Sequence, residues 1–133
     1  MTTTLDDLLK IDGVTVAFEY APDGKCTDYK AKKNVSPEMA AMITRFCALV
    51  TMTFGTLAQS FTALSEDNWI PQRGWMYSGG DYTVILGKGG YQGVFIETEK
   101  ANWEELLRLI STYVDFPVPR DKIVLKTSKS IGF

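Results

Sequence analysis

Residues 36–64, SPEMAAMITRFCALVTMTFGTLAQSFTAL, carry the strongest structural signal of the 133-residue chain. Ser36 before Pro37 is typical of a helix start, because serine caps the first turn and proline suits its first position. Large apolar residues then recur in steps of three and four, as a helical stripe requires: Met39, Ile43, Phe46, Val50, Phe54, Leu57, Phe61 and Leu64. Further apolar residues extend this surface around the helix: Ala40, Ala41, Ala48, Leu49 and Met52. The only charges are Glu38 and Arg45, so we expect this helix to be covered on two sides.

Two environments could cover the second side of the helix. A membrane is one of them, because residues 46–65 are uncharged and numerous enough to span a bilayer. Threonine, serine and glutamine recur along this stretch, however, and its flanks lack the aromatic and basic residues that anchor membrane helices. A coiled coil would need more heptads than the segment holds. We therefore expect no membrane contact, and a helix placed between its own sheet and the helix of a partner.

The segments on either side of the helix alternate apolar and polar residues, which is typical of half-buried strands. The expected elements, in chain order, are a short helix at 5–9, strands at 14–20 and 25–31, the long helix, strands at 75–77, 82–86 and 94–96, and a helix that begins with a capping box at 102–105. This order predicts an α+β domain, with a five-stranded antiparallel sheet, a long central helix and flanking helices. We expect the domain at residues 1–115 and a basic C-terminal tail at 116–133.

The composition limits the function. Fourteen basic against sixteen acidic residues give a net charge of −2, which provides no electrostatic attraction to nucleic acid or to an anionic membrane. The absence of histidine excludes histidine-dependent triads and metal sites and removes the commonest general base. We expect no enzyme activity, no metal and no cofactor. The N-terminus lacks the features of a signal peptide, and the two cysteines form no zinc motif, so we expect a cytoplasmic protein with reduced thiols.

Glycine-rich loops and thiols are the remaining candidates for chemistry. The glycines at 87–90 lie between two expected strands, whereas a phosphate cradle precedes a helix, so we interpret them as a hairpin turn. Backbone amides could bind an anion in the loop of Ser78, Gly79, Gly80 and Asp81, although a plain turn is the simpler interpretation. Cys47 lies on the long helix and is expected to be packed, so Cys26 is the more accessible thiol.

Several stretches together resemble the roadblock and dynein-light-chain superfamily, specifically a bacterial branch of it. The resembling residues are Leu8-Leu9-Lys10-Ile11-Asp12-Gly13-Val14, Ala21-Pro22-Asp23-Gly24-Lys25, Phe61-Thr62-Ala63-Leu64-Ser65, Trp69, Gly74-Trp75 and Ser78-Gly79-Gly80-Asp81-Tyr82. The resemblance implies a roadblock-like fold, with profilin-like layers of sheet and helix. It also implies dimerisation through a middle strand and the long helices, and a non-catalytic platform, often for small GTPases or motor components.

These observations predict a homodimeric scaffold or regulatory protein-binding module. The helix seam of the dimer is expected at Phe46, Val50, Phe54, Leu57 and Phe61, and the pairing strand at Gly74–Ser78 with Trp75 and Tyr77. Aromatic residues concentrate at protein interfaces, which favours this interpretation. The alternatives are a domain that senses an anionic metabolite near residues 78–81 and, less favoured, a thiol-based redox protein that uses Cys26.

Overall fold

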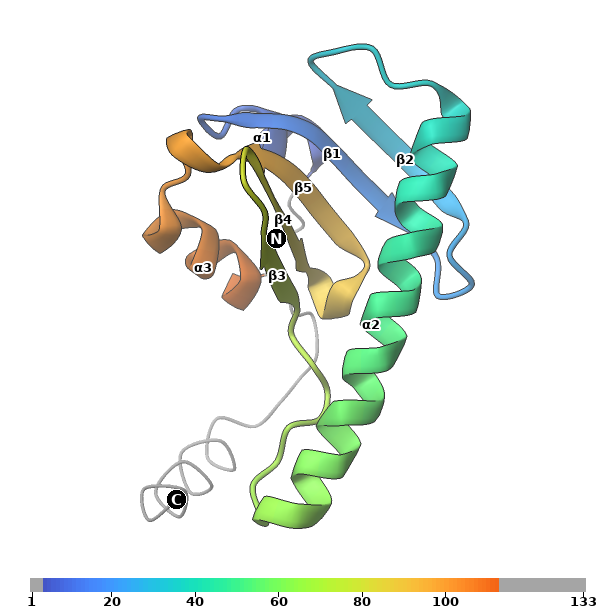
Figure 1. The fold of residues 1–133 in the computed structure, drawn as a ribbon, viewed down its shortest axis with the longest axis vertical. Coiled ribbons are helices and arrows are strands. Elements are labelled where there is room, and N and C mark those ends of the chain that lie inside the picture. Colours follow the sequence, from blue (N-terminus) through green and yellow to red (C-terminus); the bar gives the residue numbers. More distant parts are fainter. Residues whose placement is uncertain (1–3, 113–133) are drawn as a thin grey trace.

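The computed structural model describes residues 4–112 as one antiparallel sheet with helices on both faces (Figure 1). In chain order the elements are α1 (Leu5–Leu9), β1 (Val14–Tyr20), β2 (Cys26–Ala31), α2 (Pro37–Ser65), β3 (Trp75–Ser78), β4 (Tyr82–Gly87), the 3-10 turn η1 (Lys88–Gly90), β5 (Gln92–Glu97), the 3-10 turn η2 (Thr98–Lys100) and α3 (Trp103–Thr112). The expected α+β class, with five strands and one long helix, is confirmed. The expected tail at 116–133 lies outside the described residues.

The five strands lie in the order β2-β1-β5-β4-β3, so β2 and β3 form the two edges. All neighbouring strands are antiparallel. Strand β5 begins at Gln92, two residues before the expected start at 94, because its pairing with β4 continues to Gly87 beside the η1 turn. Polar Gln92 is nevertheless buried, and its side-chain amide donates to Glu19 Oε2 over 3.2 Å.

Helix α2 begins as predicted, with the Ser36 side chain accepting a hydrogen bond of 3.1 Å from the Met39 N–H. The residues that the helix buries against the sheet are small: Ala40, Thr44, Cys47, Ala48, Thr51 and Ala58. Small side chains let the helix approach the β1–β2 turn closely, and Thr44 Oγ1 donates to the carbonyl of Gly24 over 3.0 Å. The apolar surface expected around the helix is therefore divided, because Leu49 and Met52 are exposed on the side away from this packing.

The two faces of the sheet hold separate clusters of buried residues. On the α2 face the cluster consists of Val16, Phe18, Tyr20, Cys47, Ala48 and Leu86. On the opposite face α1 and α3 cover the cluster of Leu5, Leu8, Val14, Ala17, Ile85, Val94, Ile96 and Leu106. Alternation along the strands divides most of the apolar residues between the two cores. Val14 and Val16, expected on the same face, lie in different cores because the pairing of β1 with β5 shifts register between them.

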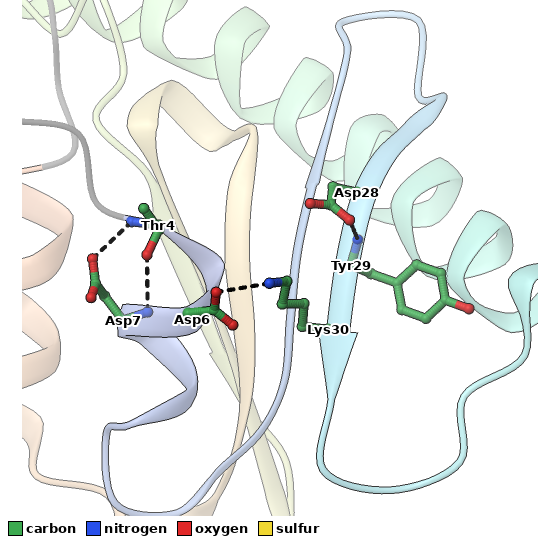
Figure 2. A network of polar contacts seen from close by, with 6 residues as sticks. All are labelled: Thr4, Asp6, Asp7, Asp28, Tyr29 and Lys30. Carbon is green, nitrogen blue, oxygen red and sulfur yellow. Dashed lines mark hydrogen bonds and ion pairs between the residues drawn. The ribbon is translucent and has the colours of Figure 1, made fainter.

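Helix α1 is short, and polar contacts hold its first turn (Figure 2). Thr4 and Asp7 form a capping box, with side chain to backbone distances of 3.1 and 3.2 Å. Backbone and side-chain hydrogen bonds from Thr4 lower the pKa of Asp7. Asp6 Oδ2 accepts from Lys30 Nζ over 2.8 Å, which ties α1 to the edge strand β2 across β1. The N-terminal helix and one edge of the sheet are therefore fixed together.

Candidate functional site

An apolar groove of about 800 Å³ runs between α2 and the β3–β4 side of the sheet. We call it the α2–β3 groove; it is lined by Met39, Met42, Ile43, Phe46, Cys47, Val50, Phe54, Trp75, Met76, Tyr77, Tyr82, Thr83, Val84 and Phe95. Among residues 4–112 its lining includes no charged side chain, although Lys33 Nζ lies 4.4 Å from the centre of the Tyr82 ring. Tyr77 is 67% exposed. Large apolar surface of this kind, left open to water, is typical of binding sites.

The groove exists because one helix is too narrow for the sheet. Five strands spaced about 4.8 Å apart are roughly 20 Å across, whereas a helix with its side chains is about 10 Å wide. Helix α2 packs on β1, β2 and η1, and Figure 1 shows it along that side of the sheet. Val84 and Phe95, on the other side of the same face, consequently remain only half-buried.

A buried hydroxyl on α2 positions the first residue of β3. Thr51 Oγ1 accepts from Trp75 Nε1 over 2.8 Å and donates to the carbonyl of Gly90 over 2.9 Å. Tyr20 OH lies 3.1 Å from the same hydroxyl and also donates to Gly90 O. Burial raises the pKa of Tyr20, so its hydroxyl stays protonated as a donor. The ring of Trp75 then meets Phe54 edge-on, with centroids 5.8 Å apart.

Four hydroxyls of α2 that lie outside its buried side bond to carbonyls of their own helix. Thr53, Thr56 and Ser65 donate to the carbonyls four residues earlier, over 2.9, 3.3 and 2.6 Å. Thr62 does the same to Ala58 O over 2.8 Å. Because these hydroxyls are satisfied locally, the outer surface of the helix is less polar than its threonine content suggests.

The two edges of the sheet differ. On β2, Lys32 N bonds to Thr15 O of β1, so by alternation the Tyr29 N–H points to the free edge. The Asp28 carboxylate accepts this N–H over 2.8 Å (Figure 2), and Lys30 adds a charge to the same strand. Edge charges and satisfied edge groups of this kind discourage the addition of another strand.

Edge strand β3 lacks such protection. Gly79 N bonds to Tyr82 O in the β3–β4 hairpin, so alternation turns the backbone groups of Met76 and Ser78 outward. The strand is Trp-Met-Tyr-Ser and holds no charge. Its outward backbone groups lie beside the α2–β3 groove, whose lining includes Met76 and Tyr77. An open strand edge and an open apolar surface are therefore adjacent.

The structure brings together most of the residues that the sequence suggested. Phe46, Val50, Phe54, Trp75 and Tyr77 all line the groove. The other two, Leu57 and Phe61, lie farther along α2, where Phe61 packs on Trp69 with centroids 5.0 Å apart. The sequence analysis missed Tyr82, Val84 and Phe95 as groove residues. Alternation indicates that Tyr82 and Val84 share a strand face, but only the tertiary structure reveals that α2 leaves this side uncovered.

The loop of Ser78, Gly79, Gly80 and Asp81 forms the tight β3–β4 hairpin. The Gly79 N–H donates to Tyr82 O, and Asp81 O accepts from Thr98 N over 2.8 Å. Ser78 Oγ lies 3.0 Å from Thr83 Oγ1. A second hollow of the molecule, about 660 Å³ and including Lys25 and Arg45, lies beside the β1–β2 turn and the start of α2. An anion site in the loop itself stays a prediction.

The thiols are poor nucleophiles. Burial raises the pKa of Cys47 to about 12. Desolvation likewise raises the pKa of Cys26, which is half-buried and lies 3.6 Å from the Asp28 carbonyl. Reactive cysteines have a lowered pKa, so the surroundings of these two residues do not favour thiol chemistry. Within residues 4–112, no group of three cysteine and carboxylate side chains is placed to hold a metal ion.

Helix α2 is long and apolar enough, by length and composition, to cross a membrane. Core helices of soluble proteins can have the same length and apolar composition. Here one side of the helix packs against the sheet through its small residues, including Ala40, Thr44 and Thr51.

The order of the strands, with one long helix on a face and two short helices on the other, defines a roadblock-like fold. The chain belongs to the family described as "Uncharacterized conserved protein (DUF2173)", which matches residues 4–112. No curated protein matches the chain.

Two solved structures of MglB proteins are similar to the chain. Myxococcus xanthus MglB matches with a TM-score of 0.61 at 16% sequence identity, over 93% of this chain and 89% of that chain. The gliding protein MglB from Thermus thermophilus matches with a TM-score of 0.62 at 11% identity, over 93% of this chain and 86% of that chain. At these identities the similarity establishes the fold alone.

Proposed function

We propose that the chain is a non-catalytic protein-binding module that forms a homodimer, in which a second copy covers the α2–β3 groove. The observation that carries this proposal is the position of the groove beside an open strand edge. A second copy offers both of the groups required, a strand with free backbone groups and a helix with an apolar stripe. Such a contact uses the same patch on both copies, as two-fold dimers do.

The length of α2 supports an antiparallel pairing of two helices. The helix has 29 residues and is therefore about 43 Å long. Its stripe continues from Met39 through Phe54 to Leu64, and these three side chains are all exposed. A two-fold axis near the middle of the helix would place the distal residues Leu57 and Phe61 against the first turns of the partner helix. The seam predicted from the sequence would then be buried along its whole length.

The superfamily resemblance suggests a small GTPase as the further partner of such a dimer. Binding of a purified small GTPase to the dimer, measured by calorimetry with the GDP and the GTP-analogue forms, tests that assignment. Cys26 and Cys47 are both free thiols, which agrees with a reducing compartment, and we propose a cytoplasmic location.

Light scattering on a size-exclusion column tests the dimer, across roughly a hundredfold range of concentration. Tyr77→Arg should raise the dissociation constant at least about a hundredfold, because two unpaired charges would be buried at the centre of the contact. Phe54→Glu is a second variant that acts on the helix side of the groove. Trp103→Arg is the matched control, since Trp103 is 41% exposed on α3, on the opposite face of the sheet. A wild-type monomer, or a Tyr77→Arg dimer of unchanged affinity, would contradict the proposal.

A further inference from the structure

The hollow of about 660 Å³ between the edge strand β2 and the first turns of α2 has no role in the proposed dimer. We call it the β2–α2 hollow. It shares no lining residue with the α2–β3 groove, and at 100° per residue the α2 residues of the two sites lie on opposite sides of the helix. On α2 it is lined by the small side chains of Ala40 and Ala41, which leave the space open. Its volume falls within the range of about 300–1,000 Å³ that is typical of small-molecule sites.

A buried hydrogen bond fixes the two walls of the hollow against each other. The hydroxyl of Thr44 on α2 donates to the carbonyl of Gly24 in the β1–β2 turn over 3.0 Å. The next residue in each segment lines the hollow, Arg45 after Thr44 and Lys25 after Gly24. The turn is itself held by the Asp23 carboxylate, which accepts from the Lys25 N–H over 2.9 Å. The backbone positions that carry the two cations are therefore set before any ligand binds.

The cationic groups of Lys25 and Arg45 have no hydrogen-bond or ion-pair partner among residues 4–112. Both residues are exposed, and the ion pairs of this part of the chain involve other lysines. The carboxylates of Asp23 and Asp28 also border the hollow. Each of them accepts a backbone N–H, over 2.9 and 2.8 Å, and neither pairs with a cation. The hollow thus offers unused cationic donors together with carboxylate oxygens that can still accept.

We propose that the β2–α2 hollow binds a small metabolite that carries one oxyanion, a phosphate or a carboxylate, together with several hydroxyl groups. The guanidinium of Arg45 can donate two parallel hydrogen bonds to an oxyanion, and such charge-assisted bonds are stronger than neutral ones. The Lys25 ammonium supplies a second charge from the opposite wall. An oxyanion between them provides the partner that both cations lack within the described part of the chain.

The other polar and aromatic residues of the hollow restrict the rest of the ligand. Asp23 and Asp28 repel a second negative charge but accept hydrogen bonds from hydroxyl groups. The half-buried ring of Tyr29, which is next to Asp28 on β2 (Figure 2), provides an apolar wall. The Tyr29 hydroxyl donates to the carbonyl of Val35 over 3.1 Å, which holds the ring in place. A short carbon skeleton with hydroxyl groups and a single oxyanion fits both kinds of neighbour.

Titrations followed by backbone amide chemical shifts test the proposal, at constant ionic strength. The probes are ribose 5-phosphate, ribonate as the matched carboxylate, and ribose as the neutral molecule. We expect saturable shifts at Gly24, Lys25, Ala41 and Arg45 with at least one of the two anions and none with ribose. The anion that saturates at the lower concentration identifies the phosphate or the carboxylate as the preferred group. No saturable shift with either anion, or the same shifts with ribose, would overturn the proposal.

Two charge-removing variants separate the hollow from the basic surface around it. Arg45→Gln should raise the dissociation constant of the better anion at least about tenfold, because the charge-assisted bonds are lost. Lys32→Gln is the matched control, since Lys32 is exposed and lies outside the hollow, and it should change the constant less than about twofold. Equal weakening by both variants would contradict the assignment. Tyr77→Arg should bind the anion as the wild type does, so this inference and the groove dimer can fail independently.

Discussion

The hydroxyl of Thr51 provides the sharpest test of how α2 holds β3. Thr51→Val removes the hydroxyl and leaves a β-branched side chain of nearly the same shape, so packing and helix propensity change little. In the wild type this buried hydroxyl accepts from Trp75 Nε1 over 2.8 Å and donates to Gly90 O over 2.9 Å. Gly90 O also accepts from Tyr20 OH, so this carbonyl still has a hydrogen-bond donor in the variant. Trp75 Nε1 loses its acceptor.

The loss in unfolding free energy follows from this single donor, Trp75 Nε1, which is left without an acceptor. An unsatisfied buried donor costs about 1–3 kcal/mol, and because Trp75 is half-buried we place the loss near the middle, at about 2 kcal/mol. For a domain of this size that loss corresponds to a fall in Tm of roughly 6–8 °C. The slope of the unfolding free energy against urea should stay unchanged, because the surface exposed on unfolding is the same.

Urea unfolding at one fixed protein concentration, followed by circular dichroism and tryptophan fluorescence, measures this loss. Thr53→Val is the matched control on the same helix, because the exposed Thr53 hydroxyl donates to Leu49 O of its own helix. It should change the unfolding free energy by less than about 0.5 kcal/mol. Equal losses in the two variants would refute the assignment of Thr51 as the contact that fixes Trp75.

Two further predictions concern β3 and the thiols. A Cβ added at Gly74 would lie 1.9 Å from Leu86 O, so Gly74→Ala should displace the start of β3 and destabilise the protein by more than about 2 kcal/mol in urea unfolding. At Gly80, where a Cβ meets no heavy atom within 4 Å, the alanine variant should be near neutral, and similar losses would argue against the clash. In a Cys26→Ser variant, the rate of Cys47 alkylation by iodoacetamide should rise with pH without levelling off below about pH 12, because the raised pKa keeps the thiol protonated. A plateau near pH 9 would contradict this assignment.

Local pattern was enough to predict the elements of the fold. Ser36 with Pro37 marks the start of α2 within one residue, and the alternation of Val14, Val16 and Phe18 identifies β1. The start of β5 was missed because Gln92 is polar and Gly93 has no side chain, so neither contributes to an apolar pattern. Both are buried in the structure, and at Gly93 a Cβ would lie 2.7 Å from Ile85 O. Tertiary packing, rather than local preference, places them in the sheet.

The candidate site was predictable in part for a related reason. Phe46, Val50 and Phe54 fall on one stripe, and a helix with so few charges indicates a second covered side. What the sequence could not reveal is which half of the sheet α2 leaves bare. That depends on the small residues Ala40 and Thr44, which bring the helix to the β1–β2 side. They belong to a stripe of small residues in helical steps, but small residues alone do not indicate which strands they contact. The groove residues of β4 and β5 could therefore be found only from the structure.

The difference between the two sheet edges limits how far the protein can polymerise. In the dimer proposed above, which pairs the two copies at β3, the free ends of the combined sheet would both be β2 strands. Each β2 strand carries the charged Lys30, which forms an ion pair with Asp6. The Tyr29 N–H of the same strand already donates to the Asp28 carboxylate. Such an edge accepts a further strand less readily than β3 does, which disfavours growth of the sheet beyond two copies. A change that opened β2, such as Asp28→Val, is therefore expected to favour further growth of the sheet.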